Sequence, residues 1–232
     1  MSIDTQRIIA LVPIKGHSER VPFKNIRNFA GKPLLYWILS MLQDYSAVKD
    51  IFVDTDNAEI KDIIHQYLGD SVKIIDRPES ICGDYISMNQ IIEYDLSVIK
   101  GDHFLQTHST NPLLKVATID QAINKYFSVI NDAYDSLFSV NRFQSRFYDS
   151  KGNPINHDPA SLIRTQDLSP VYEENSNFYI FSRDVFLQTS SRIGKKPYLF
   201  EVPKIECFDI DDESDFKMAE KMFLITNPQA SS

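Results

Sequence analysis

The chain has 232 residues, and its 32 acidic residues outnumber its 24 lysines and arginines, which gives a formal net charge of -8 at pH 7. This acidic balance argues against non-specific binding to nucleic acid or to a membrane surface. No apolar run reaches membrane-spanning length, and the opening MSIDTQR contains no apolar signal core. The two cysteines, Cys82 and Cys207, form no metal-spaced pair, which favours a reducing compartment. We therefore expect one cytoplasmic domain, 1–232, with neither a nucleic-acid nor a membrane partner.

Strand-like and helix-like segments alternate along the first 140 residues. Short apolar runs predict buried strands at 8–12, 51–53, 72–75, 103–106 and 136–140. Apolar residues at helical spacing predict helices that begin at Pro33, behind a cap at Asp56 or Asn57, and over 87–99 and 118–130. This alternation predicts an α/β fold with a mostly parallel sheet, helices on both faces, and ligands at the carboxyl ends of the strands.

The pattern changes after Val140. Residues 141–177 are polar, have no helical period and contain a turn candidate at Lys151-Gly152-Asn153, which predicts an inserted hairpin or arm. Further strands are expected at 178–181, 198–202 and 206–210, followed by a helix over 212–226 and a loose tail.

A cluster of cations follows the first predicted strand. Residues 11–33 hold five basic residues and one acidic residue, although the chain as a whole is negative. Pro13 and Gly16 end the strand, so the cations lie in a loop before the helix that starts at Pro33. We expect this loop to bind an anion, namely a nucleoside triphosphate; a solvated loop that binds nothing is the other interpretation. The five cations are Lys15, Arg20, Lys24, Arg27 and Lys32.

A second cluster, CFDIDDESD at 207–215, is acidic. Asp209 and Asp211 stand two residues apart at the end of a predicted strand, where alternate side chains share a face, so both carboxylates can reach one Mg²⁺. The carboxylates that follow have an ordinary explanation, because acidic residues are favoured in the first turn of any helix. Asp209 lies between apolar residues and lacks that explanation. We therefore predict that Asp209 and Asp211 are magnesium ligands.

Six motifs in the same order resemble the acylneuraminate cytidylyltransferase family, the CMP-sialic acid synthetases. The opening VPIKGHSERVPFKNIRNFAGKPLLYW resembles the family's IPARxGSKxxPxKNxxxxxGKPL, and VDTDNAEI, RPESICGD, LQTHSTNPLL, RTQDLSPVYEENSNFYIF and FDIDDESDFKMAE follow. The resemblance runs from about Ile8 to Met222 and is far more specific than a lone glycine motif. It implies a three-layer, Rossmann-like nucleotide-diphospho-sugar transferase fold and an arm, 141–177, through which family members form homodimers.

The resemblance also implies roles for individual residues. The cradle for the triphosphate and ribose of CTP is Lys15, Ser18, Arg20, Lys24 and Asn25, and the residues that read cytosine and ribose are Arg77 and Ser87. The sugar pocket is lined by Gln106, Arg164, Gln166 and Tyr179, and the magnesium ligands are Asp209 and Asp211.

The implied reaction transfers CMP from CTP to the 2-hydroxyl of a sialic-acid-like nonulosonic acid, and pyrophosphate leaves. Catalysis of such a transfer is mostly positioning and charge neutralisation. Lys24 and Arg20 would offset charge on the α-phosphate and the pyrophosphate, and Arg164 would hold the sugar carboxylate. Asp211 would help to remove the hydroxyl proton. Mg²⁺ would bridge phosphate oxygens.

Several departures from the family patterns bear on the substrate. Lys15 stands where arginine is usual, Glu19 where lysine is usual, and Thr165 replaces the second arginine of RRQ. Ser176-Asn177 replaces the Gly-Ala of ENGA, and THSTN lengthens the loop after Gln106. These departures leave the CTP chemistry in place and leave open which acid is used, legionaminic and pseudaminic acid included. A Kdo-type or other sugar nucleotidyltransferase and a non-catalytic nucleotide-binding module are the alternatives.

Other polar residues have structural as well as functional interpretations. His103 begins a strand and is expected to be structural, whereas His108 lies in the lengthened loop near the sugar and His17 lies in the phosphate loop. Asp54 and Asp56 could form a second metal pair, although helix capping explains Asp56. The absence of GxGxxG and of GK[ST] after the first strand disfavours a dehydrogenase and a P-loop kinase.

Overall fold

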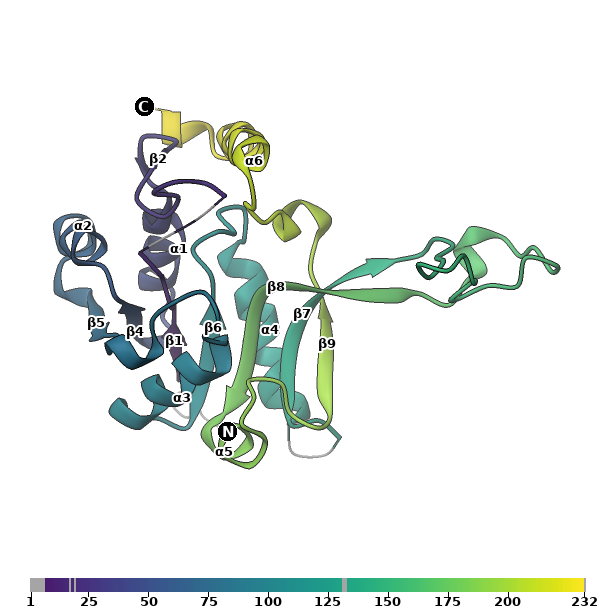
Figure 1. Cartoon of the computed structure of the whole chain (residues 1–232), viewed down its shortest axis with the longest axis horizontal. Coiled ribbons are helices and arrows are strands. Elements are labelled where there is room, and N and C mark those ends of the chain that lie inside the picture. The colour runs from purple at the N-terminus through teal and green to yellow at the C-terminus, as the bar shows by residue number, and fades with distance from the viewer. Residues whose placement is uncertain (1–6, 17, 19, 131–132, 232) are drawn as a thin grey trace.

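The computed structural model describes residues 7–16, 18, 20–130 and 133–231, so His17 and Glu19 lie outside the described residues. Those residues form three layers, with a seven-stranded sheet between two layers of helices (Figure 1). The elements in chain order are β1 (Ile8–Leu11), β2 (Asn28–Phe29), β3 (Lys32–Pro33), α1 (Leu34–Gln43), β4 (Val48–Thr55), α2 (Ala58–Leu68), β5 (Val72–Asp76), α3 (Met88–Val98), β6 (His103–Thr107), α4 (Val116–Val129), β7 (Ser136–Phe143), β8 (Val171–Ser182), α5 (Arg183–Thr189), β9 (Pro197–Glu201) and α6 (Glu213–Thr226).

The sheet is mostly parallel, as the alternation of strands and helices predicts. Within the described residues its order is β5-β4-β1-β6-β8-β7-β9. Strands β5, β4, β1 and β6 are parallel neighbours and β9 is parallel to β7, whereas β8 runs antiparallel to both β6 and β7. The loops after Leu11, Thr55 and Thr107 therefore meet at one edge of the sheet, where a ligand site is expected.

Two apolar clusters hold the helices on the sheet. On one face the sheet packs against α1, α2 and α4, with Leu35, Ile64 and Ile119 fully buried. On the other face it packs against α3 and α5 through residues that include Ile92 and Phe186. Strand β1 is buried on both faces, as its unbroken apolar sequence predicts.

A third cluster fixes α6 to the segment that contains the basic loop. Phe29 of β2 and Phe216 of α6 pack edge to face with ring centroids 5.5 Å apart, and Phe223 contacts the same ring at 5.4 Å. This packing brings the acidic segment that precedes α6 next to the basic loop, although the two lie almost 190 residues apart in the sequence.

Strands β7 and β8 extend beyond the sheet as a long hairpin, and the segment between them projects away from the layered body (Figure 1). The hairpin pairing reaches Phe143 and Val171. Farther out, Tyr148 and Pro154 form a bridge around the turn predicted near Gly152, which has a φ of 83° that favours glycine. The arm is thus built partly on continuous strands that begin inside the sheet.

Three predictions about elements are wrong. Residues 206–210 form no strand: the first two belong to the 3₁₀ helix Lys204–Cys207 and the rest to a loop. The backbone of this loop pairs with another loop, since the Ile210 N–H donates to the Thr110 carbonyl at 3.2 Å. Pro33 precedes α1 with an extended ψ of 141° instead of opening the helix. The expected loose tail contains a 3₁₀ helix, Pro228–Ser231.

Among the described residues, no helix is long and apolar enough to cross a membrane.

Candidate active site

A polar cleft of about 490 Å³ lies at the carboxyl ends of β1, β5 and β6. Residues of the segments 83–91 and 108–110, which follow β5 and β6, also line the cleft. Six of the seven residues that the sequence assigns to CTP line this cleft, namely Lys15, Ser18, Arg20, Lys24, Asn25 and Arg77. The resemblance did not single out Asp84, His108, Ser109 and Thr110, which line the cleft as well.

Ser87 does not line the cleft and instead caps α3. Its hydroxyl oxygen accepts from the Gln90 N–H at 3.3 Å, and the Gln90 side chain accepts from the Ser87 N–H at 2.9 Å. This reciprocal pair is a capping box, which satisfies two backbone donors at the start of a helix. The structure therefore gives Ser87 a structural role, and its neighbour Met88 contacts the cleft.

The basic loop is bound to the acidic segment by three contacts. Arg20 pairs with Asp211 at 2.6 Å, Lys24 Nζ donates to the Ile210 carbonyl at 2.6 Å, and Arg27 forms a forked pair with Glu213. The two clusters that the sequence predicts separately thus form one surface of matched charge. Of the other two cations, Lys15 pairs with Asp84 across the cleft at 2.8 Å, and Lys32 lies over the rings of Tyr36 and Tyr67.

Lys24 lies beside Asp209 and Asp211. Burial lowers the pKa of Lys24, and the two carboxylates oppose that shift. Burial likewise raises the pKa of Asp209, while a hydrogen bond from Thr110 and the charge of Lys24 oppose the rise. Two neighbouring carboxylates, one partly buried and one exposed, fit a magnesium ion that keeps several water and phosphate ligands. No group of three or more His, Cys, Asp or Glu residues suited to a metal occurs among the described residues.

The acidic residues after Asp211 serve the helix, as expected for a first turn. Asp212 is the N-cap of α6 and accepts from the N–H groups of Ser214 and Asp215, and Asp215 accepts from the Asp212 N–H at 3.0 Å. Glu213 pairs with Arg27.

Arg77 belongs to a buried cluster with two carboxyl groups. Its Nε contacts Asp54 Oδ1, and the side chains of both residues are at most 3% exposed. Asp95 of α3 is 1% exposed and shares a hydrogen bond with Asp54. Burial first, and the Asp54 charge second, raise the pKa of Asp95 to about 9. Asp54 is thus buried in an ion pair with Arg77, whereas Asp56 accepts from the Gly16 N–H at 2.8 Å.

Asp95→Asn should stabilise the protein, and the gain should grow as the pH rises. Folded Asp95 keeps its proton up to about pH 9, whereas the unfolded group releases it near pH 4, so wild-type stability falls between these values at up to about 1.4 kcal/mol per pH unit. Asparagine needs no proton and still donates to Asp54. Thermal unfolding of both proteins at pH 5 and pH 8 measures the difference. Equal destabilisation at both pH values would show that Asp95 carries no proton.

The lengthened loop after β6 is held on both sides. Ser109 Oγ donates to Asn25 Oδ1 at 2.8 Å, which joins this loop to the basic loop. Asn111 donates to the side-chain oxygen of Asn177, and Asn177 Nδ2 donates to the Glu206 carbonyl at 2.7 Å. Asn111 and Asn177 are both 1% exposed or less. These bonds connect the loop to the segment that carries Asp209.

Ser176 has a φ of 58°, in the left-handed region where glycine is favoured. The family pattern has glycine at this position, so serine departs from a residue type that the backbone prefers. The residue lies where the pairing of β7 with β8 shifts register, between Phe138 and Val140.

The sugar-pocket predictions divide into two groups. Gln106 and Tyr179 are direct partners across β6 and β8, and both are fully buried. Arg164 and Gln166 lie in the arm, where Arg164 pairs with Asp167 at 2.7 Å and is exposed. Within one chain Gln106 and Tyr179 lie together, whereas the segment between β7 and β8, to which the two arm residues belong, projects away from the layered body (Figure 1).

His108 extends the site from Gln106 into the cleft. Its Nε2 lies 3.1 Å from Gln106 Nε2, and burial lowers its pKa to about 3. His108 is therefore a neutral hydrogen-bonding group at neutral pH. His103 contacts the Tyr126 hydroxyl at 3.0 Å and packs against Phe127, a structural role that the sequence predicts.

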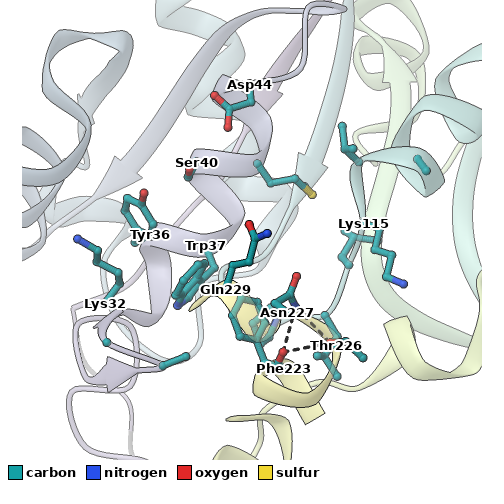
Figure 2. Close-up of a pocket in the computed structure, with 18 residues that line it drawn as sticks. Lys32, Tyr36, Trp37, Ser40, Asp44, Lys115, Phe223, Thr226, Asn227 and Gln229 are labelled. Atoms are coloured by element: carbon teal, nitrogen blue, oxygen red, sulfur yellow. Dashed lines mark hydrogen bonds between the residues drawn. The ribbon is translucent and has the colours of Figure 1, made fainter. Parts of the chain in front are cut away.

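A larger cavity, about 750 Å³, lies between α1, the start of α4 and α6. Figure 2 shows Trp37 and Phe223 facing each other in it, with Thr226 and Asn227 hydrogen-bonded at its edge. Trp37 also donates to the Phe29 carbonyl at 2.8 Å, so it packs as a core residue. Of the five cations of the basic loop only Lys32 lines this cavity, and the residues predicted to bind CTP, the sugar and magnesium do not.

This mostly parallel α/β sheet, with helices on both faces and a basic loop at its carboxyl edge, has the Rossmann-like nucleotidyltransferase fold. Two solved structures share this fold. One is CMP:2-keto-3-deoxy-manno-octonic acid synthetase complexed with CTP (TM-score 0.67, 12% identity, covering 95% of this chain and 99% of that one). The other is 4-diphosphocytidyl-2C-methyl-D-erythritol synthase from Anaerococcus prevotii (TM-score 0.68, 11% identity, covering 94% and 97%).

The chain belongs to the Cytidylyltransferase family, whose sequence model matches residues 9–228. N-acylneuraminate cytidylyltransferase A of Danio rerio is 29% identical over 228 residues, which cover 95% of this chain and 51% of that protein. Pseudaminic acid cytidylyltransferase of Campylobacter jejuni is 24% identical over 233 residues, which cover 96% of this chain and 98% of that protein. The chain thus spans about half the length of the Danio relative and nearly all of the Campylobacter one.

Proposed function

We propose that this protein transfers CMP from CTP to the 2-hydroxyl of a sialic-acid-like nonulosonic acid and releases pyrophosphate. The observation that carries the proposal is that Lys24 and Arg20, which line the cleft, interact with Asp209 and Asp211 beside it. Cations and a carboxylate pair on two adjacent loops are what a reacting triphosphate needs. The names of the relatives support the same chemistry.

Each residue of the cleft has a task in this reaction. Lys24 and Arg20 offset negative charge on the α-phosphate and the leaving pyrophosphate, because these charges grow in the transition state. The Asn25 side chain donates to the Lys15 carbonyl and accepts from Ser109 Oγ. These two bonds fix its orientation, so it can hold a ribose or phosphate oxygen. Arg77 faces the cleft from its buried pair with Asp54, where it is available to the cytosine ring.

Asp209 and Asp211 would hold Mg²⁺, together with water and phosphate oxygens. The ion, when bound, supplies charge neutralisation at the phosphate and lowers the pKa of the attacking hydroxyl. Asp211 is about half exposed and pairs with Arg20 of the cleft, and it is the carboxylate that we assign to the proton of the acceptor hydroxyl. Its pairing with Arg20 keeps both groups at the reaction centre.

We also propose that the protein is a cytoplasmic homodimer that associates through its arm. Exposed apolar side chains gather there, and they include Tyr148, Ile155, Leu162 and Ile163. A second copy that covers this surface would bring the arm residues Arg164 and Gln166 toward the sugar pocket of its partner, which one chain alone does not do.

A pyrophosphate-release assay tests the proposed function. The protein is incubated with Mg²⁺, CTP and, in separate reactions, N-acetylneuraminic, legionaminic, pseudaminic and Kdo acids. We expect release with at least one nonulosonic acid and loss of release when EDTA removes the metal. Release with Kdo alone would select the Kdo-type alternative. No release with any sugar, while CTP still binds, would select a nucleotide-binding module.

A further inference from the structure

Arg192 covers the two buried residues that the sequence assigns to the sugar pocket. Its NH1 donates to Gln106 Oε1 at 2.6 Å, and its guanidinium carbon lies 3.6 Å from the centre of the Tyr179 ring. Gln106 and Tyr179 are themselves 0% exposed. A ligand that approaches this part of the sheet edge therefore meets Arg192 before it meets either of them.

The charge of Arg192 has no carboxylate partner among the described residues. The charge of Glu174 acts on Arg192, but its carboxylate accepts from the Tyr179 hydroxyl, and burial lowers the pKa of Arg192. A guanidinium carries five N–H donors in a planar fork, and Gln106 takes one of them. A largely buried cation with spare donors is favourable where a ligand supplies the negative charge.

The loop that carries Arg192 is fixed at both ends. The Arg192 N–H donates to Asn89 Oδ1 at 3.3 Å, and the Gly194 N–H donates to Ser136 Oγ at 2.9 Å. Asp135 accepts from the N–H groups that follow, and a Cβ at Gly194 would lie 2.2 Å from the Asp135 carboxylate. The loop is therefore packed too closely to swing away, and it holds the guanidinium in place.

We propose that Arg192 determines acceptor specificity by pairing with the carboxylate of the acceptor sugar. The inference rests on the proposed function and adds a residue to it, since the sequence motifs assign this carboxylate to Arg164. Arg164 lies in the arm and already pairs with Asp167, whereas Arg192 comes from the same chain and contacts both Gln106 and Tyr179. An acceptor without an acidic group would leave the Arg192 charge unpaired and would be rejected.

A double-mutant cycle in which one change is made in the protein and the other in the substrate tests this pairing. The acceptor that gives the highest kcat/KM in the pyrophosphate-release assay is compared with its methyl ester, on the wild type, Arg192→Met and Arg192→Lys. We expect Arg192→Met to raise the acceptor KM by roughly 100-fold and to change the CTP KM by less than about twofold. On the wild type, the methyl ester should be a poorer acceptor than the acid by a similar factor. On Arg192→Met, the ester should be little poorer than the acid, because the pairing is already lost. Arg192→Lys should fall between them, because lysine keeps the charge but loses the fork.

Two further arms keep the outcomes distinct. Arg164→Gln is the matched rival: if it removes the preference for acid over ester and Arg192→Met retains that preference, the proposal is overturned. If Arg192→Met unfolds in a thermal melt, Arg192→Lys is used in its place. The proposal is then overturned if the ratio of kcat/KM for the acid to kcat/KM for the ester is the same in Arg192→Lys as in the wild type. If no sugar supports release, calorimetric binding of N-acetylneuraminate and its methyl ester to the same proteins tests Arg192 separately from the reaction.

Discussion

Asp211→Asn should lower kcat by roughly 1,000-fold or more while the protein stays folded. Asparagine removes a negative charge from the carboxylate pair and from the partner of Arg20, so both the metal and the cation lose an anchor at the reacting phosphate. The side chain of Asp211 is about half exposed, so its pair with Arg20 contributes little to folding stability. Pyrophosphate release at saturating CTP and Mg²⁺, together with a thermal melt, measures both effects.

Asp212→Asn is the matched control for this variant. It removes the same charge one residue later, but asparagine caps a helix as well as aspartate does, so α6 keeps its N-cap. We expect activity within about twofold of the wild type. If Asp211→Asn is as active as Asp212→Asn, Asp211 has no place in the metal site.

Lys24→Met should lower kcat by roughly 100- to 1,000-fold, with a smaller change in the KM for CTP. Lys24 interacts with both carboxylates through its charge, and it fixes the Ile210 carbonyl that lies between them in the sequence. Methionine keeps the length of the side chain and loses the charge that offsets the developing negative charge on phosphate. Steady-state kinetics over a range of CTP concentrations separates kcat from KM.

Lys32→Met provides the comparison within the same loop. Lys32 lies over the rings of Tyr36 and Tyr67 and does not line the polar cleft, so its removal should leave kcat within about twofold. Equal losses in the two variants would mean that the loop acts through its total charge and that Lys24 has no particular position at the phosphate.

Most of the sheet follows from local sequence pattern. The run from Ile8 to Val12 has no polar residue, which is possible only for a strand covered on both faces, and the structure has β1 there. The segment around Asp209 misled the prediction, because FDI alternates like a strand. Its backbone is engaged by the Thr110 carbonyl and by loops, and such long-range partners leave no trace in a local pattern.

Site residues that belong to a sequence motif could be predicted, whereas those that tertiary packing brings to the site could not. The positions of Lys24 and Asn25 in the cleft follow from their place after β1. Arg192 lies in the connection between α5 and β9, which has no motif, and its contacts with Gln106 and Tyr179 join segments that are far apart in the sequence. Ser87 shows the reverse case, since a residue matched by motif is used by a helix cap.

The bond between Asn111 and Asn177 makes two departures from the family pattern depend on each other. Asn111 belongs to the inserted THSTN, and Asn177 stands where the pattern has alanine. With only one of the two asparagines, a buried amide would lose its partner, at a cost of about 1–3 kcal/mol. The two changes are therefore epistatic, and an evolutionary path that acquired them one at a time had to cross a less stable intermediate. A chimera between relatives therefore has to exchange the loop after β6 and residue 177 of β8 together.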